Sequence, residues 1–255
     1  MIRSGGRVAL GFAMALSWAC ALGQGFNIDI DIFGGPENIG NGAPSSSFDA
    51  AAGQPGYWNR LSYGGLPQQV RDLQGESSGI TMSVSSKLNL FHGAGFEFEG
   101  NTGDFARLLN DGTEVGSVVQ GGDATYSFDG LALGPYHVYT YAVHPVGPVD
   151  TPILIPEAIE NQTQVVTGPM PGNSFEYLVT HSIHLVDCSS SDSFQITIVQ
   201  PPGMPHNMFV NGFQVVAVPE PSAATAIAVF VALLMVKRNI MKSEGEVANE
   251  IEQNR

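Results

Sequence analysis

Alternation of apolar and polar residues is the feature that most constrains this fold. The clearest example is Phe26–Ile32 (FNIDIDI), which places Asn27, Asp29 and Asp31 on the face opposite its apolar residues. A period of two is the pattern of a β-strand that has one face against a core, whereas an amphipathic helix repeats every 3.6 residues. We therefore expect residues 26–32 to form a strand with one solvated face.

Further alternating or β-branched segments follow, separated by turn residues such as Asn110-Asp111-Gly112 and Gly121-Gly122. They are Gly79–Ser85, Gly95–Glu99, Asp123–Asp129, Tyr136–Val143, Phe175–Val186, Ser193–Val199 and Met208–Ala217. One short helix is expected at Asp104–Leu109, capped by Asp104 or Thr102. Many short strands without a longer repeat predict an all-β protein, an antiparallel β-sandwich or jelly roll.

Two of these segments carry more specific predictions. Tyr136–Val143 is apolar on both faces, so we expect it to be a central strand. In the closing segment, Gly212 predicts a bulge or a close approach of two backbones.

The N-terminus has the pattern of a secretory signal peptide. Arg3 and Arg7 precede the apolar run Val8–Leu22, and small residues allow cleavage after Gly23 or Ala21. We therefore assign residues 1–23 to a signal peptide and expect the rest of the chain to be exported. A lipoprotein signal centred on Cys20 is the alternative, but the residues before Cys20 fit it poorly.

A second apolar run, Ala223–Val236, precedes the cations Lys237 and Arg238. Its length as a helix is about 21 Å, shorter than the roughly 30 Å of a bilayer's hydrocarbon core, yet it lacks a polar face. A helix that is apolar all round favours lipid over a small protein's core, so we predict a single transmembrane helix at 223–236 rather than a buried core helix. The following cations predict a cytoplasmic C-terminal end.

Together these features resemble the PEP-CTERM sorting signal of bacterial exopolysaccharide-associated proteins. The resemblance rests on Pro219, Glu220 and Pro221, the apolar run, and Lys237-Arg238. It implies that an exosortase-type enzyme processes the chain and delivers it to the cell surface or extracellular matrix. The same tag is also known as an ice-binding protein C-terminal domain. The alternative reading of Pro-Glu-Pro is a stiff linker before an anchor.

The predicted domains follow from these boundaries. Residues 24–217 form the extracytoplasmic β-sandwich, 218–242 the sorting signal, and 243–255 an acidic cytoplasmic tail that departs from the family's usual ending. The order of phrases from GYWNRL to FVNGFQVV is similar to the jelly-roll ectodomains of planctomycete PEP-CTERM proteins. That resemblance implies a galactose-binding-like sandwich.

The charge of the chain limits its partners. The formal net charge is −14 at pH 7. An acidic surface without a basic patch excludes nucleic acid and anionic headgroups, whereas neutral glycans and divalent cations remain compatible. The body contains a single cysteine, Cys188, which we expect to be a buried, unreactive thiol.

The sequence offers one cluster suited to sugars. Tyr57 and Trp58 can stack on the C–H face of a sugar ring, and the neighbouring Asn59 amide can bond hydroxyl groups. The alternative is that Trp58 is a core aromatic at one end of the sandwich.

Calcium is the one cofactor for which the sequence offers ligands. Asp29 and Asp31 share a strand face and, with Asp187 or Asp192, can supply carboxylate oxygens. His181 and His184 lie three apart in a predicted strand, so their side chains should point to opposite faces and not converge on a metal.

The function predicted from these features is that of a non-enzymatic surface or exopolysaccharide-matrix protein with carbohydrate-binding capacity. The alternative is a secreted polysaccharide hydrolase or lyase, which needs two acids facing each other across a cleft. An ice-binding adhesin is the third hypothesis, and the regular threonine ladder that it requires is absent from the sequence.

Overall fold

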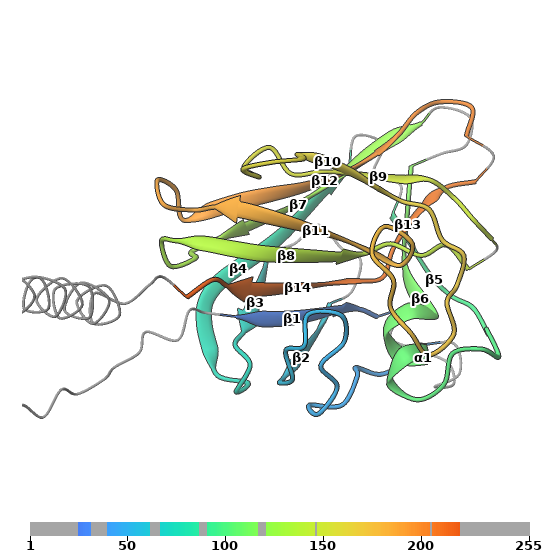
Figure 1. Cartoon of the computed structure of the whole chain (residues 1–255), viewed down its shortest axis with the longest axis horizontal. Coiled ribbons are helices and arrows are strands. Elements are labelled where there is room, and N and C mark those ends of the chain that lie inside the picture. The colour runs from blue at the N-terminus through green and yellow to red at the C-terminus, as the bar shows by residue number, and fades with distance from the viewer. Residues whose placement is uncertain are drawn as a thin grey trace, which may run out of the picture.

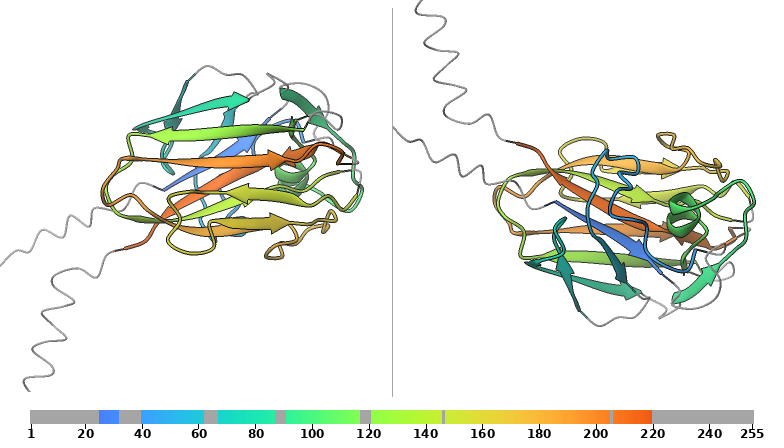
Figure 2. Two further views of the ribbon diagram at one scale, coloured as in Figure 1. Left: turned by 90° about the horizontal axis from the view of Figure 1, so that it is seen from above. Right: turned by 90° about the horizontal axis from the view of Figure 1, so that it is seen from below.

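Two facing β-sheets form the body of the protein (Figures 1 and 2). The computed structural model of the chain describes residues 25–31, 40–61, 67–86, 91–116, 121–145, 147–204 and 206–219. The five-stranded sheet has the order β11-β8-β14-β1-β2, and the six-stranded sheet has the order β10-β9-β12-β7-β4-β3. A third sheet, β13-β6-β5, closes one end beside the helix α1 (Asp104–Leu109).

The strands have the following bounds. The five-stranded sheet consists of β11 (His181–Asp187), β8 (Pro135–Tyr141), β14 (Gly212–Ala217), β1 (Phe26–Ile30) and β2 (Trp58–Leu61). The six-stranded sheet consists of β10 (Thr163–Val166), β9 (Thr151–Leu154), β12 (Ser193–Gln200), β7 (Gly122–Asp129), β4 (Ser77–Ser86) and β3 (Gln68–Arg71). The small sheet consists of β13 (Met208–Val210), β6 (Asp111–Val115) and β5 (Phe91–Gly95).

The main core lies between the two large sheets. Aromatic rings from both sheets meet there: the Phe128 and Phe194 rings stack at 4.9 Å between centroids, and the Tyr126 ring meets Phe213 edge-on at 4.9 Å. Each of these rings is buried, as are the alternate residues of the strands that carry them. The prediction of a mostly antiparallel all-β sandwich is thus confirmed, with one parallel pair, β1 and β2.

A second apolar cluster covers part of the outer surface of the five-stranded sheet. Its buried members include Trp58, Leu108 and Tyr141, and Phe48 and Phe175 pack against them. The segment 43–51, helix α1 and the segment 170–175 supply most of the cover. One half of that sheet is therefore covered on both faces.

The expectation of a solvated face on β1 is wrong. Asn27, Asp29 and Asp31 are all buried, because the loop of residues 40–56 lies over them. Asn27 Nδ2 donates to the backbone carbonyl oxygen of Gln54, Gln54 Nε2 donates to Asn27 Oδ1, and Gly42 N donates to Asp31 Oδ2 at 2.9 Å. Alternation located the strand correctly, but a polar covering loop buries its polar face as fully as a core would.

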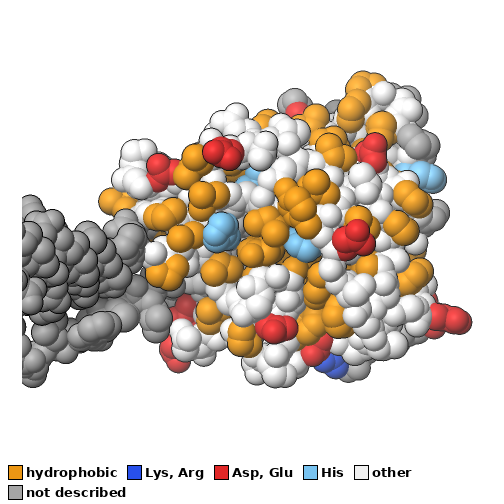
Figure 3. All heavy atoms as spheres, viewed as in Figure 1, with side chains coloured by type: hydrophobic (Ala, Val, Ile, Leu, Met, Phe, Trp, Pro, Cys, Tyr) orange, Lys and Arg blue, Asp and Glu red, His pale blue; other side chains and the backbone are white. Residues whose placement is uncertain are grey.

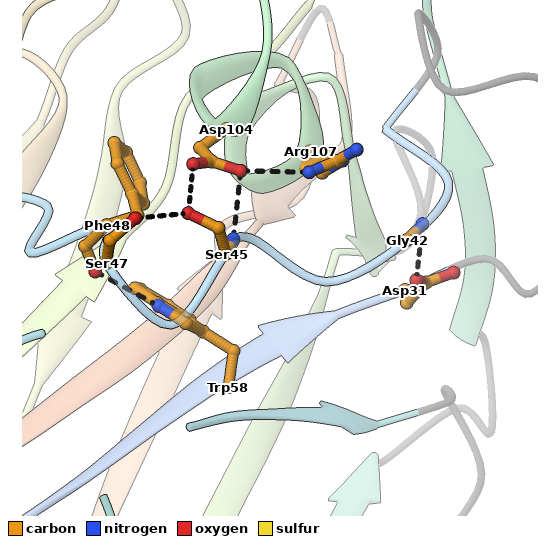
Figure 4. Close-up of polar contacts among 8 residues, drawn as sticks. All are labelled: Asp31, Gly42, Ser45, Ser47, Phe48, Trp58, Asp104 and Arg107. Carbon is orange, nitrogen blue, oxygen red and sulfur yellow. Dashed lines mark hydrogen bonds and ion pairs between the residues drawn. The ribbon is translucent and has the colours of Figure 1, made fainter. Parts of the chain in front are cut away.

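The predicted helix at Asp104–Leu109 is confirmed, although its predicted cap is not. Gly103, with φ of 57°, is the residue before the helix, and no side chain caps its N-terminus. The Asp104 carboxylate instead accepts hydrogen bonds from the backbone N and Oγ of Ser45, and forms an ion pair with Arg107 at 3.0 Å (Figure 4). Asp104 thereby fastens the covering loop to the helix.

Three further predictions concern local geometry. Asn110-Asp111-Gly112 was expected to be a turn, but Asp111 and Gly112 begin strand β6. Gly95–Glu99 was expected to be a strand, whereas β5 ends at Gly95. The close backbone approach expected at Gly212 is confirmed, since a Cβ there would lie 2.4 Å from the carbonyl oxygen of Ile28.

Several predicted features lie outside the described residues. They are the signal peptide at 1–23, Glu220, Pro221, the apolar run 223–236, Lys237, Arg238 and the tail 243–255. Pro219 is described and is exposed. Within the described ranges, no helix is both long and apolar enough to cross a lipid bilayer.

Candidate functional site

The outer face of the five-stranded sheet presents three rows of side chains. The alternate residues of β8 and β14, such as Val138 and Phe213, point into the core, so their neighbours point outward. Strand register then sets the rows across β14, β8 and β11. The first row is Val216, His137 and Leu185; the second is Gln214, Tyr139 and Ile183; the third is Gly212, Tyr141 and His181.

Exposure decreases from the first row to the third. All three side chains of the first row are half-buried, as are Tyr139 and Ile183 in the second. Tyr141 and His181 in the third row are buried beneath the second apolar cluster. We call the first two rows on β8 and β11, together with Tyr177, the open face; its members are His137, Tyr139, Ile183, Leu185 and Tyr177.

His181 lies at the centre of an aromatic group at the inner margin of the open face. Its ring stacks on Tyr139 at 5.9 Å and meets the exposed Tyr177 ring at 6.4 Å. Burial lowers the pKa of His181 to about 4, so the ring is neutral at physiological pH. Thr180 Oγ1 lies 2.9 Å from His181 Nδ1 and fixes the ring's orientation.

The strand rows of the open face combine apolar and aromatic surface, and the exposed Glu176 is next to Tyr177 in the chain. Hydrophobic side chains, with histidines among them, gather over β8 and β11 in Figure 3. None of the three rows contains Asp, Glu, Lys or Arg. Burial raises the pKa of the Tyr139 hydroxyl, which therefore stays protonated and can donate a hydrogen bond. Such a surface can bind a neutral ligand that has both apolar faces and hydroxyl groups.

The sequence-predicted sugar cluster is divided by the fold. Trp58 is 3% exposed, and its indole Nε1 donates to the carbonyl oxygen of Phe48 at 3.2 Å (Figure 4). Asn59 is buried as well, and its amide bonds the backbone of Asn27 and Arg71. Only Tyr57 keeps an exposed ring, so the core alternative describes Trp58, and a stacking role for its ring is not supported.

The two predicted calcium ligands have different environments. Asp31 accepts from Arg60 Nε at 2.6 Å, whereas neither carboxylate oxygen of Asp29 has a hydrogen-bond partner among the described residues. Burial, followed by the charges of Asp111 and Asp31, raises the pKa of Asp29 well above its usual range. Asp187 and Asp192 are exposed near the turn between β11 and β12, away from this cluster, and do not join it.

The remaining chemical candidates are structural. His184 pairs with Val138 in register and His181 with Tyr141, so the two histidines point to opposite faces as predicted. Cys188 is buried, and burial raises the pKa of its thiol to about 11, which suits an unreactive thiol. Among the described residues, no group of three or more His, Cys, Asp or Glu side chains is placed to hold a metal ion.

Sequence reasoning missed the open face. The signal was available in Tyr136–Val143, whose two apolar faces identified a central strand, as β8 proves to be. The pattern could not show that Tyr139 lies half-buried at the edge of the second apolar cluster. Tyr177 was predicted to lie in a strand at Phe175–Val186, whereas β11 begins only at His181.

Comparisons with known proteins found distant structural similarity only. No family model matches the chain, and no curated protein matches it. TmCBM61, solved with β-1,4-galactotriose, aligns with 54% of this chain and 88% of its own at 13% identity and a TM-score of 0.35. The 4-O-methyl-α-glucuronidase BtGH115A, described as specific for decorated arabinogalactans, aligns over 47% of this chain and 15% of its own, at 16% identity and a TM-score of 0.28.

A third similar structure comes from work on carbohydrate-binding modules of the β-sandwich superfamily. It aligns with 60% of this chain and 73% of its own at 12% identity and a TM-score of 0.25. Similarity at these levels establishes neither a shared ligand nor a shared activity.

Proposed function

We propose that this chain is a non-catalytic, exported surface or matrix protein whose sandwich binds a neutral polysaccharide through the open face. The observation that carries the proposal is the uncharged aromatic surface formed by Tyr139, Tyr177 and the aliphatic side chains beside them. Aromatic rings favour the C–H faces of sugars, and hydroxyl and imidazole groups bond sugar hydroxyls. The open face offers both kinds of group.

Charge supports a neutral ligand. The chain as a whole carries a formal charge of −14, so an anionic polysaccharide would be repelled at long range. The open face has no cation to offset that repulsion. A neutral glycan meets neither obstacle.

The position of the domain's two ends supports display at a surface. Phe26 lies opposite Val215 in the β1–β14 pair, and Val218 N donates to the carbonyl oxygen of Pro135 at 2.9 Å. Both connections therefore leave the sandwich at one end, opposite α1 (Figure 1). In the proposed arrangement, residues 1–23 are the signal peptide and residues 223–236 are the membrane anchor. An exosortase-type enzyme processes the chain at Pro219-Glu220-Pro221, and Lys237-Arg238 hold the anchor. This arrangement would leave the open face accessible along the side.

The hydrolase or lyase alternative has less support. Glycoside hydrolysis needs two acids that can reach a sugar in a cleft. Among the described residues, the acidic cluster around Asp29 is fully buried. The strand rows of the open face carry no acid.

Binding can be tested by retention of the purified full chain on insoluble neutral polysaccharides and on the host's own extracellular polysaccharide. We expect Tyr139→Ala and Tyr177→Ala each to reduce the bound fraction at least about tenfold, as loss of a central aromatic contact does in a binding site. Tyr57→Ala is the matched control, since Tyr57 is exposed on the β2 side and should leave binding unchanged. Circular dichroism checks that each variant is folded.

Equal retention of the three variants would remove the open face as the site. Loss of retention with Tyr57→Ala alone would move the site to the β2 side of the sheet. A wild-type chain that binds none of the polysaccharides would overturn the proposed function.

Sorting can be tested separately in the native host. Glu220→Ala should leave the protein in the inner membrane, with its C-terminal segment attached, because the recognition sequence is lost. Glu244→Ala in the predicted tail is the control and should not change processing. Fractionation with mass determination of the C-terminus gives the answer, and unchanged surface delivery of the Glu220→Ala variant would argue against exosortase handling.

A further inference from the structure

Tyr177 has the most exposed ring of the open face, and its hydroxyl is bonded to the interior. The side chain is 49% exposed, yet its hydroxyl donates to Oε1 of Gln164 at 3.2 Å. Gln164 is only 8% exposed and lies in β10, the edge strand of the six-stranded sheet. The bond therefore connects a ring of the open face to a buried amide of the other sheet.

Gln164 is itself fixed, because its side-chain amide bonds both backbone groups of Ile183 in β11. Ile183 N donates to Gln164 Oε1 at 3.1 Å, and Gln164 Nε2 donates to the carbonyl oxygen of Ile183. The amide thus takes the place of a neighbouring strand at this edge of the five-stranded sheet. Its Oε1 accepts from both Ile183 N and the Tyr177 hydroxyl, which uses both lone pairs of the oxygen. An acceptor held in this way can orient the tyrosine that donates to it.

The backbone on either side of Tyr177 is constrained as well. Glu176 N donates to Thr180 Oγ1, and Thr180 Oγ1 donates to the carbonyl oxygen of Glu176, both at 2.9 Å. Leu178 has a φ of 62°, which a residue with a side chain keeps only where its surroundings impose it. Its N donates to the carbonyl oxygen of His181 at 2.8 Å. The backbone that carries the Tyr177 ring is therefore set before any ligand binds.

His181 lies between Tyr177 and the second tyrosine ring of the open face, Tyr139. The plane of the Tyr177 ring makes an angle of 62° with that of His181, and the plane of the Tyr139 ring makes an angle of 26° with it. The two tyrosine planes therefore differ by at least 36°, which is 62° less 26°. A ligand that contacts both rings has to match this relative angle, so the orientation of Tyr177 determines how well the ligand fits.

We propose that Gln164 is a positioning residue, which holds the Tyr177 ring in the orientation that binds a neutral polysaccharide. The inference rests on the proposed function and adds a buried residue that acts through Tyr177. Without the bond to Gln164, an exposed tyrosine would sample several rotamers and would have to be immobilised when the ligand binds. A ring that is already oriented avoids this loss of entropy.

The test removes the bond from each end and measures the affinity of the purified full chain for the host's extracellular polysaccharide. Gln164→Met removes the acceptor, and Tyr177→Phe removes the donor while keeping the ring. Each variant should bind about three- to tenfold more weakly, the cost of ordering one side chain on binding. The double variant should bind no more weakly than the weaker of the two single variants, because both substitutions remove the same bond.

Asn59→Leu is the matched control, which separates loss of stability from loss of positioning. Asn59 makes the same kind of contact at the other edge of the five-stranded sheet, in β2. Its Nδ2 donates to the carbonyl oxygen of Arg71 at 2.9 Å, and its Oδ1 accepts from Arg71 N at 2.8 Å. Asn59→Leu should lower the Tm, as Gln164→Met should, and leave the affinity for the polysaccharide unchanged.

Fluorine NMR of the full chain labelled with 3-fluorotyrosine reports on the ring without any ligand. The Tyr177 signal is assigned from its absence in Tyr177→Phe. It should become narrower in Gln164→Met, because the released ring moves faster, and it should keep its width in Asn59→Leu.

Unchanged affinity of Gln164→Met or of Tyr177→Phe, on a polysaccharide that retains the wild type, would overturn the inference and leave the proposed function intact. Losses that multiply in the double variant, or an unchanged Tyr177 signal in Gln164→Met, would overturn it as well. If Gln164→Met does not fold, Gln164→Ala replaces it, since the smaller side chain lets water reach the backbone of Ile183. A wild-type chain that the polysaccharide does not retain would instead overturn the proposed function.

Discussion

At the scale of single residues, Gln214 shows how the polar side of β1 is buried without loss of hydrogen bonding. Its Oε1 accepts from the Tyr141 hydroxyl and from Ala52 N, and its Nε2 donates to Asn27 Oδ1 at 3.0 Å. One amide thus connects two strands and the covering loop. A buried polar network of this kind is stabilising only while every member is bonded.

Trp58 provides the residue-scale prediction. Because its ring is buried against Phe48 and beneath the covering loop, Trp58→Ala should lower the free energy of unfolding by about 3–5 kcal/mol. Tyr57→Ala, at the exposed neighbouring position, should cost under about 1 kcal/mol. Denaturant unfolding of the two variants checks this, and equal costs would contradict the placement of Trp58 in the core.

At the scale of elements, strands were predictable where alternation was undisturbed. Asp123–Asp129 and Ser193–Val199 match β7 and β12 to within a residue at each end. These two strands pair with each other along their whole length, so each has one face in the core and one outside. That environment produces the period-two pattern on which the prediction rested.

Other elements could not be read from local pattern. β6 begins with Asp111-Gly112, a typical turn pair, and Gly112 is required there because a Cβ would lie 2.2 Å from the carbonyl oxygen of Val210. β9 contains Pro152, which normally argues against a strand. Both strands are specified by contacts with distant segments, which local sequence does not display.

The residues of the candidate site are also brought together by contacts between distant segments of the chain. Sequence placed Tyr139 and Ile183 in strands, yet it could not show that they are neighbours in one row. It also placed Asp29 and Asp31 on one face correctly, while Asp111 arrives from a strand about eighty residues further along the chain. The sequence therefore predicted which of these residues lie in strands, but it did not predict which of them are neighbours in space.

At the scale of the whole molecule, buried histidines make stability depend on pH. Burial lowers the pKa values of His144, His181 and His184 to about 4, with the charge of His206 also acting on His144. Unfolded histidines titrate near 6.5. Between these values the unfolded chain binds more protons, so stability falls as the pH drops from about 6.5 towards 4.

We therefore expect the free energy of unfolding to fall between pH 7 and pH 5 by on the order of 1 kcal/mol per buried histidine, and the Tm to fall with it. Asp29 acts in the opposite sense, because its raised pKa makes the fold lose stability as the pH rises. His184→Gln should flatten the dependence between pH 7 and pH 5. Thermal unfolding at constant ionic strength measures this, and a Tm that does not change with pH would contradict the burial of neutral histidines.

The central place of β14 has a consequence for biogenesis. β14 pairs with β8 on one side and β1 on the other, so these two strands share no edge until residues 212–217 arrive. During synthesis, Phe26, Val138 and their neighbours therefore stay unshielded until this strand arrives. Assembly of the sheet then ends with insertion of a late strand between β8 and β1, so the yield of folded protein should depend on how long the earlier strands stay exposed before residues 212–217 arrive.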